Sequence, residues 1–130
     1  MSRDIIHTDN APAAVGTYSQ AVKVNKTVYI SGQIWLVPNT MTLADGFVAQ
    51  ANQVMSNIEA ICQAAGGSLA NVVKFNVSLT DLADFTALNE IFAVRLSAPY
   101  PARAAVQVAA LPKGAVVEIE AILVLDWFWF

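Results

Sequence analysis

The chain is poor in the residues that several classes of protein depend on. Among its 130 residues are one cysteine, one histidine and only seven lysines and arginines. The single cysteine, Cys62, forms no internal disulfide, and no cluster of Cys, His and Asp has the spacing of a metal site. A nucleic-acid surface needs a basic stripe to contact phosphates, and scattered basic residues with a net charge of −3 do not provide one.

Long apolar runs and cofactor motifs are absent as well. No run reaches the about 18 apolar residues that a membrane span requires, and no secretory leader pattern opens the chain. The sequence also contains no P-loop, no dinucleotide-binding fingerprint and no nucleophile elbow. We therefore expect a cytoplasmic protein without a metal site, a nucleic-acid partner or a membrane anchor.

Apolar side chains are what the sequence has in excess. They make up 56% of the residues, against about 45–50% on a slightly different residue set in typical soluble domains. A length of 130 residues predicts one domain, residues 1–130, which is large enough to bury a core. Because a free aromatic terminus such as residues 126–130 favours aggregation in water, we expect some of the apolar surface to meet another chain.

The apolar periodicity predicts the element order β-β-α-β-α-β-β. Period-two alternation and turn residues indicate strands, and apolar spacings of three and four indicate amphipathic helices. Each helix has apolar residues that a sheet must cover, so the expected fold class is α+β, a mixed sheet with two helices on one face. Strands are expected over residues 18–24, 27–31, 72–80, 103–109 and 116–125, and helices over residues 47–65 and from 81 or 84 to about 97.

The other face of this sheet is expected to be apolar, with carboxylates set into it. Val116, Ile122 and Val124 share their parity with Glu118 and Glu120 on the last strand. Packing of a second subunit on this face satisfies such a pattern best.

Arg103 is the residue whose surroundings most need an explanation. It alternates with Ala105 and Gln107 in an apolar strand, and burying a guanidinium without a partner costs several kcal/mol. A hairpin between the last two strands would place Arg103 on the same face as Glu118 or Glu120. Spacing alone favours a cross-strand ion pair, and the alternative is a site in which the arginine binds the carboxylate of a small ligand.

Other candidate residues have simpler interpretations when each is taken alone. Tyr18 opens the first strand, and Gly32 ends the second, where a turn is favoured over close approach of the backbone to a ligand. Asn89 lies on the apolar side of the second helix, which favours a satisfied amide. Cys62 is expected to pack in the core, and His7 to lie on the surface.

As a whole, the chain resembles the RidA/YjgF family of enamine/imine deaminases. The resemblance covers nearly all of it and is specific because separate motifs occur in the right order. These motifs are residues 10–20 (NAPAAVGTYSQ), 31–34 (SGQI), 57–60 (NIEA), 99–103 (PYPAR), 111–113 (LPK) and 117–121 (VEIEA).

The resemblance implies a fold, an assembly and an activity. The fold is chorismate-mutase-like, and the assembly is a homotrimer with a central β-barrel and three sites in the clefts between subunits. The activity is that of a 2-iminobutanoate/2-iminopropanoate deaminase, a hydrolase of C=N bonds. It converts short-lived 2-enamino and 2-imino acids to 2-keto acids and ammonia, and it needs no cofactor.

The resemblance also assigns roles to particular residues. Arg103 matches the arginine that holds the substrate carboxylate, and Glu118 matches the glutamate that positions or activates the attacking water. Glu120 is expected to be structural. Where many members have a cysteine, this chain has Ala105, which keeps only the backbone carbonyl. The positions that line the pocket are Tyr18, Ser31, Gly32 and Asn89.

Apolar residues replace more polar ones at several positions of the family pattern, and they motivate a second hypothesis. A trimeric interaction scaffold, natural or engineered, would use them as surface patches for a protein partner or for higher-order, cage-like assembly, with deaminase activity incidental. A third hypothesis is a regulator that senses 2-keto acids through Arg103 without turnover. The patch residues are Trp35, Leu36, Val94, Leu96, Trp127, Phe128, Trp129 and Phe130.

Overall fold

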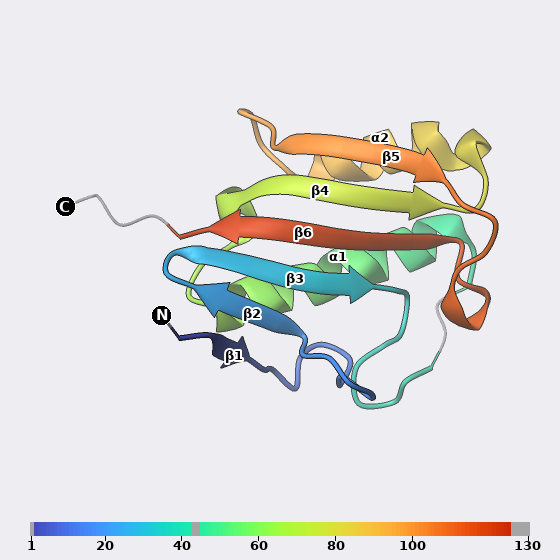
Figure 1. Ribbon diagram of the computed structural model, residues 1–130. Coiled ribbons are helices and arrows are strands. Elements are labelled where there is room, and N and C mark those ends of the chain that lie inside the picture. Colours follow the sequence, from blue (N-terminus) through green and yellow to red (C-terminus); the bar gives the residue numbers. More distant parts are fainter. Residues whose placement is uncertain (1, 43–44, 126–130) are drawn as a thin grey trace.

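The computed structural model describes residues 2–42 and 45–125, which form a six-stranded sheet and two α-helices (Figure 1). The α-helices are α1 (Phe47–Ala64) and α2 (Phe85–Arg95). Among the described residues, no helix is both long enough and apolar enough to cross a membrane. The strands are β1 (Asp4–Ile6), β2 (Ala21–Val24), β3 (Thr27–Gln33), β4 (Val72–Leu79), β5 (Ala102–Gln107) and β6 (Val117–Val124).

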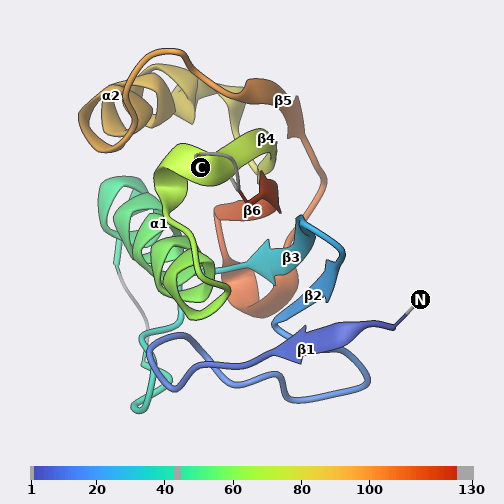
Figure 2. The same ribbon diagram turned by 90° about the vertical axis from the view of Figure 1, so that its left-hand side faces the viewer.

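The sheet is mixed and has the strand order β1-β2-β3-β6-β4-β5. Neighbouring strands are antiparallel except β4 and β5, which run parallel and are connected through α2. Both helices lie on one side of the sheet (Figure 2). The α+β class and this arrangement are confirmed, and β1 is the one element that the sequence did not indicate, because three residues are too few to show alternation.

The last two strands do not form the hairpin that we expected. β5 lies at the sheet edge beside β4, and β6 is inserted between β3 and β4. Two strands that are connected by a helical crossover pair in parallel, and β5 therefore lies along one edge of β4. The other edge of β4 is left for β6.

The core lies between the sheet and the helices. Alternate residues of β4 and β6, such as Phe75, Val77 and Ile119, face the helices and are almost completely buried. α1 ends at Ala64, which confirms the expected helix over residues 47–65 to within one residue, and the Gly67 N–H donates to the Cys62 carbonyl at 2.9 Å just beyond its end.

The opposite face of the sheet is open and partly apolar, as expected. Tyr29 on β3, which is 52% exposed, pairs in register with Ile122 on β6. Glu118 and Glu120 lie on the same face, because the residues that alternate with them, Val117 and Ile119, are fully buried against the helices.

Three of the expected surface patch residues are buried instead. Trp35 and Leu36 are 2% and 7% exposed and form a small second core with Ala115, and Leu96 is 9% exposed in the main core. Val94, 87% exposed, is on the surface as expected. The remaining patch residues, 127–130, lie outside the described residues.

Asn57 explains why the segment after β3 is held against α1. This side chain is fully buried, and its Nδ2 donates to the backbone carbonyls of Ile34, at 3.3 Å, and Leu36, at 3.0 Å. Its Oδ1 accepts from Gln53 at 2.9 Å. The segment that carries Trp35 is therefore tied down by an interaction between residues more than 20 positions apart.

We predict that Asn57→Ala destabilises the protein by about 1–3 kcal/mol, because it leaves buried carbonyl groups without a donor. Urea unfolding at fixed protein concentration measures the change. Thr86→Ala, an exposed position on α2, is the control and should change the free energy of unfolding by less than about 0.5 kcal/mol. Equal stability of the Asn57 variant and the wild type would contradict this account.

Candidate functional site

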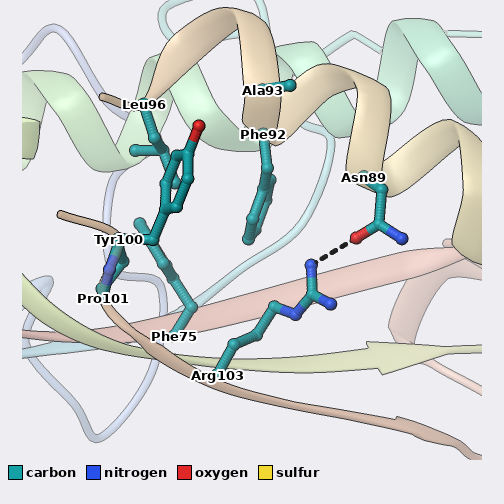
Figure 3. A pocket seen from close by; sticks show the side chains of 8 residues that line it. All are labelled: Phe75, Asn89, Phe92, Ala93, Leu96, Tyr100, Pro101 and Arg103. Carbon is teal, nitrogen blue, oxygen red and sulfur yellow. Dashed lines mark hydrogen bonds between the residues drawn. The ribbon is translucent and has the colours of Figure 1, made fainter. Parts of the chain in front are cut away.

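Arg103 extends from the sheet edge toward α2. It pairs in register with Phe75, so its side chain lies on the helix-covered face of the sheet. Its Nη1 donates to the Oδ1 of Asn89 at 2.6 Å (Figure 3). The guanidinium carbon lies 5.0 Å from the centre of the Phe85 ring and 5.6 Å from that of Phe92, which are cation–π distances.

The expected ion pair of Arg103 is not formed. Among the described residues, no carboxylate lies within 4.0 Å of its guanidinium. Glu118 and Glu120 project from the other face of the sheet, because they pair with residues of β4 that alternate with Phe75, the partner of Arg103. Arg103 is also exposed rather than buried, so it needs no carboxylate of the same chain to offset desolvation.

The Arg103 cavity, as we call the hollow beside this side chain, has a volume of about 470 Å³. One end carries the guanidinium and the Asn89 amide, and the other end is formed mostly by apolar groups, with Tyr100 and its hydroxyl beside Leu96 (Figure 3). Its lining residues are Phe75, Asn89, Phe92, Ala93, Leu96, Tyr100, Pro101 and Arg103.

Glu118 lines a different cavity, which we call the Glu118 cavity, of about 330 Å³. Among the described residues, the two cavities have no lining residue in common. Tyr18, Gly32 and Lys113 are in its wall together with Glu118. The other lining residues are Pro12, Ala13, Val15, Gln20, Gln33, Ile34, Leu36 and Pro112.

Gly32 is required for the position of the Glu118 carboxyl group. A Cβ atom at Gly32 would lie 2.9 Å from Glu118 Cδ and 3.0 Å from its Oε2, closer than such atoms approach. The carboxyl group therefore packs directly on the backbone of β3. The group that approaches the Gly32 backbone is therefore a side chain of the protein. Neither earlier interpretation of Gly32, a turn or a close approach to a ligand, included this contact.

Hydrogen bonds from Ser31 on β3 fix the segment that carries Tyr18, and the side chain of Gln20, just before β2, fixes residues 8–12. Ser31 Oγ donates to the Ser19 carbonyl at 2.6 Å, and the Ser31 N–H donates to the Gln20 carbonyl at 3.0 Å. The Gln20 side chain, 2% exposed, donates to the carbonyls of Pro12 at 2.7 Å and of Thr8 at 3.0 Å. Ser31 thus supports the wall of the Glu118 cavity rather than lining it.

Burial raises the pKa of the Glu118 carboxyl above its ordinary value, and the Glu120 carboxylate raises it further. A carboxylate with a raised pKa is a stronger base toward a bound water molecule. Glu120 itself is exposed and accepts from Asn76 Nδ2 at 3.1 Å, which agrees with a structural role.

Two residues that the sequence reading missed are Phe85 and Phe92, which lie under the Arg103 guanidinium. With Asn89 they form an i, i+4, i+7 series on α2, so the helical spacing contained the signal. Ala105 lies two residues after Arg103 on the same face of β5, where it pairs with Val77 and packs against the core.

Cys62 and His7 have the ordinary roles that were expected. Cys62 is fully buried, and burial, helped by the Glu59 charge, raises the pKa of its thiol to about 12. Such a thiol stays protonated and inert. His7 is exposed, with its Nε2 3.1 Å from Asp9 Oδ1.

The fold and the cavities together define a class of protein: a two-layer α+β domain with an arginine-lined cavity at one sheet edge and a glutamate-lined cavity on the opposite face. The family is defined by sequence as well. The chain belongs to the family described as Endoribonuclease L-PSP, whose model matches residues 8–125, and the resemblance to RidA/YjgF proteins is thereby confirmed.

Relatives and solved structures agree with this assignment. The chain is 51% identical over 123 residues to the rat 2-iminobutanoate/2-iminopropanoate deaminase, covering 94% of this chain and 90% of the relative. The human protein of that name is 50% identical over the same coverage. A crystal structure of RidA from an Antarctic Psychrobacter bacterium is 72% identical, with a TM-score of 0.92 and coverage of 94% and 99%.

We predict that Glu118→Gln stabilises the folded protein at neutral pH, with a gain that fades in acid. Because the folded-state pKa of Glu118 is raised, the penalty on the folded state grows as pH rises from the unfolded-state pKa of about 4.3 and is complete above the folded-state pKa, whereas well below about pH 4.3 Glu118 is protonated in both states and the penalty is absent. Urea unfolding of wild type and variant between pH 3.5 and 8 measures the difference. Glu90→Gln, an exposed position on α2, is the control, and a gain independent of pH would refute the assignment.

Proposed function

We propose that the protein is an imine deaminase that hydrolyses 2-imino acids and their 2-enamino tautomers to 2-keto acids and ammonia. The observation that carries the proposal is Arg103, whose guanidinium is held by an amide and two aromatic rings while no carboxylate of the described chain pairs with it. An arginine fork arranged in this way suits the carboxylate of a small ligand. Relatives that are about half identical over most of their length have this activity in their names.

The reaction needs orientation and proton transfer, which these residues supply. Arg103 binds the substrate carboxylate, and this fixes the neighbouring C=N carbon. Glu118 takes a proton from a water molecule while the oxygen of that water forms a bond to the C=N carbon. Glu118 then gives a proton to the nitrogen. Collapse of the resulting carbinolamine forms the keto group and releases ammonia, so that one water is consumed for each imine.

Arg103 and Glu118 act together, in this proposal, across the interface of a homotrimer. Within one chain they lie on opposite faces of the sheet and line different cavities. The open face around Tyr29 and Ile122 is apolar enough to pack against another subunit. Each site then combines the Arg103 of one chain with the Glu118 of its neighbour, with Tyr18, Gly32, Asn89 and Ala105 around them.

The word endoribonuclease in the family description suggests another activity, which charge disfavours. RNA binding depends on clustered basic groups, and this chain has seven lysines and arginines against ten acidic residues. A structure of the Escherichia coli relative TdcF, 42% identical, contains bound serine, a small molecule with a carboxylate. A regulator that binds 2-keto acids would use the same arginine, and turnover separates the two functions.

We predict that Arg103→Ala lowers kcat/KM by about 10- to 100-fold through the lost carboxylate contact, and Glu118→Gln by about 100-fold or more through kcat. A threonine dehydratase supplies the imine, semicarbazide competes for it, and 2-keto acid formation is followed. Arg103→Lys keeps the charge without the fork and should be intermediate. Glu90→Gln is the control. Full activity of Arg103→Ala would refute the proposal, and binding of 2-keto acids without turnover would identify the regulator.

A mixing experiment tests the shared site. We predict that chains with Arg103→Ala and chains with Glu118→Gln, each nearly inactive alone, regain about one quarter of wild-type activity when unfolded and refolded together in equal amounts, because random trimers then contain that share of intact sites. Absence of recovery in mixed trimers, verified by two affinity tags, would place both residues of a site in one chain.

A further inference from the structure

One stripe of α2 forms a wall of the Arg103 cavity. Asn89, Phe92, Ala93 and Leu96 follow one another at helical spacings of three, one and three, so they share a face of the helix. Asn89 lies at the polar end, beside Arg103, and Leu96 at the other (Figure 3). Polarity therefore decreases along the cavity from the guanidinium.

The apolar end is preformed. The rings of Phe75 and Phe92 pack 5.2 Å apart at 51°, and these residues are fully or almost fully buried in the core. Leu96 is also buried, whereas Tyr100, 65% exposed, flanks the opening (Figure 3). These rings and aliphatic groups are fixed by core packing, and together they form a wall that favours an apolar part of a ligand.

The cavity is larger than a three- or four-carbon substrate requires. Its volume of about 470 Å³ falls in the range of about 300–1,000 Å³ that holds whole drug-sized ligands. The side chain of a 2-imino acid is attached to the same carbon as its carboxylate. A substrate held by Arg103 can thus direct its side chain along the cavity, past Phe92 toward Leu96.

We propose that the apolar end of this cavity is a side-chain subsite, and that the protein favours 2-imino acids with a large apolar side chain, branched aliphatic or aromatic, over those with a methyl group. The inference rests on the proposed function, because it assumes that Arg103 binds the carboxylate. It adds a residue, Ala93, that limits side-chain size from the rim of the cavity.

Imines that differ only in their side chain test the preference. A D-amino-acid oxidase converts D-alanine, D-leucine and D-phenylalanine to the corresponding 2-imino acids, and semicarbazide competes with the protein for each. We expect kcat/KM to be about tenfold or more higher for the leucine- or phenylalanine-derived imine than for the alanine-derived imine. A preference for the alanine-derived imine would overturn the subsite.

Filling the cavity gives a sharper test. Ala93→Phe should lower the ratio of kcat/KM for the large imines over that for the small one by about tenfold, because the added ring occupies the space of the side chain. Val94→Phe adds the same ring at the next residue, which is 87% exposed and does not line the cavity, and it should leave the ratio unchanged. Equal ratios in the two variants would overturn the inference.

A binding measurement separates failure of the subsite from failure of the proposed function. Calorimetry with 4-methyl-2-oxopentanoate and with pyruvate compares a large and a small 2-keto acid without any turnover. If no imine is hydrolysed but the larger acid binds about tenfold more tightly, and Ala93→Phe removes the difference, the function fails and the subsite stands. If imines are hydrolysed but the two acids bind equally, the function stands and the subsite is overturned.

Discussion

The parallel pairing of β5 with β4 is the constraint on which the site depends. A helical crossover from β4 must return beside it, so β5 takes the sheet edge and α2 lies over the pair. This pairing turns Arg103 toward α2, onto Asn89 and the Phe85 and Phe92 rings. It also forces β6 to the other side of β4, where alternation directs Glu118 to the opposite face. The separation of the two cavities is thus a consequence of topology and register, and the proposed site, which uses both Arg103 and Glu118, needs a second chain.

The surroundings of Arg103 show how a cation is held in place without being neutralised. An ion pair would fix the side chain but would compete with the carboxylate of a ligand. A single amide acceptor and the faces of two rings restrict the guanidinium while leaving its net charge intact. The Glu118 carboxyl is in the opposite situation, since burial and the nearby Glu120 charge raise its pKa. One group thereby keeps its charge available for binding and the other becomes more basic.

Much of this arrangement follows from sequence, and the part that does not has a physical reason. Periodicity within an element is local, so both helices, the faces of β4 and β6 and the α+β class could be predicted from it. Which strand lies next to which is a long-range property, and for this reason spacing alone favoured an ion pair of Arg103 that depends on a hairpin the protein does not form. Burial of Trp35 likewise depends on Asn57, 22 positions away, whose amide ties down the backbone on both sides of it. Motif resemblance pointed to the candidate residues, but it carried no information about which contacts hold them.

A reaction as easy as imine hydrolysis is suited to a site divided in this way. Addition of water to a C=N bond needs a fixed carbon and one proton carrier, and neither demands that all groups come from one rigid element. In the proposed reaction, the Arg103 cavity, built on α2 and β5, would hold the substrate, whereas the Glu118 cavity, built on β3 and β6, would handle the proton. Because the α2 stripe does not contact Glu118 in the same chain, a substitution at Ala93 changes the space for a side chain without altering the environment that sets the basicity of the glutamate. Selection among substrates and chemistry at the C=N carbon are therefore physically separable in this fold.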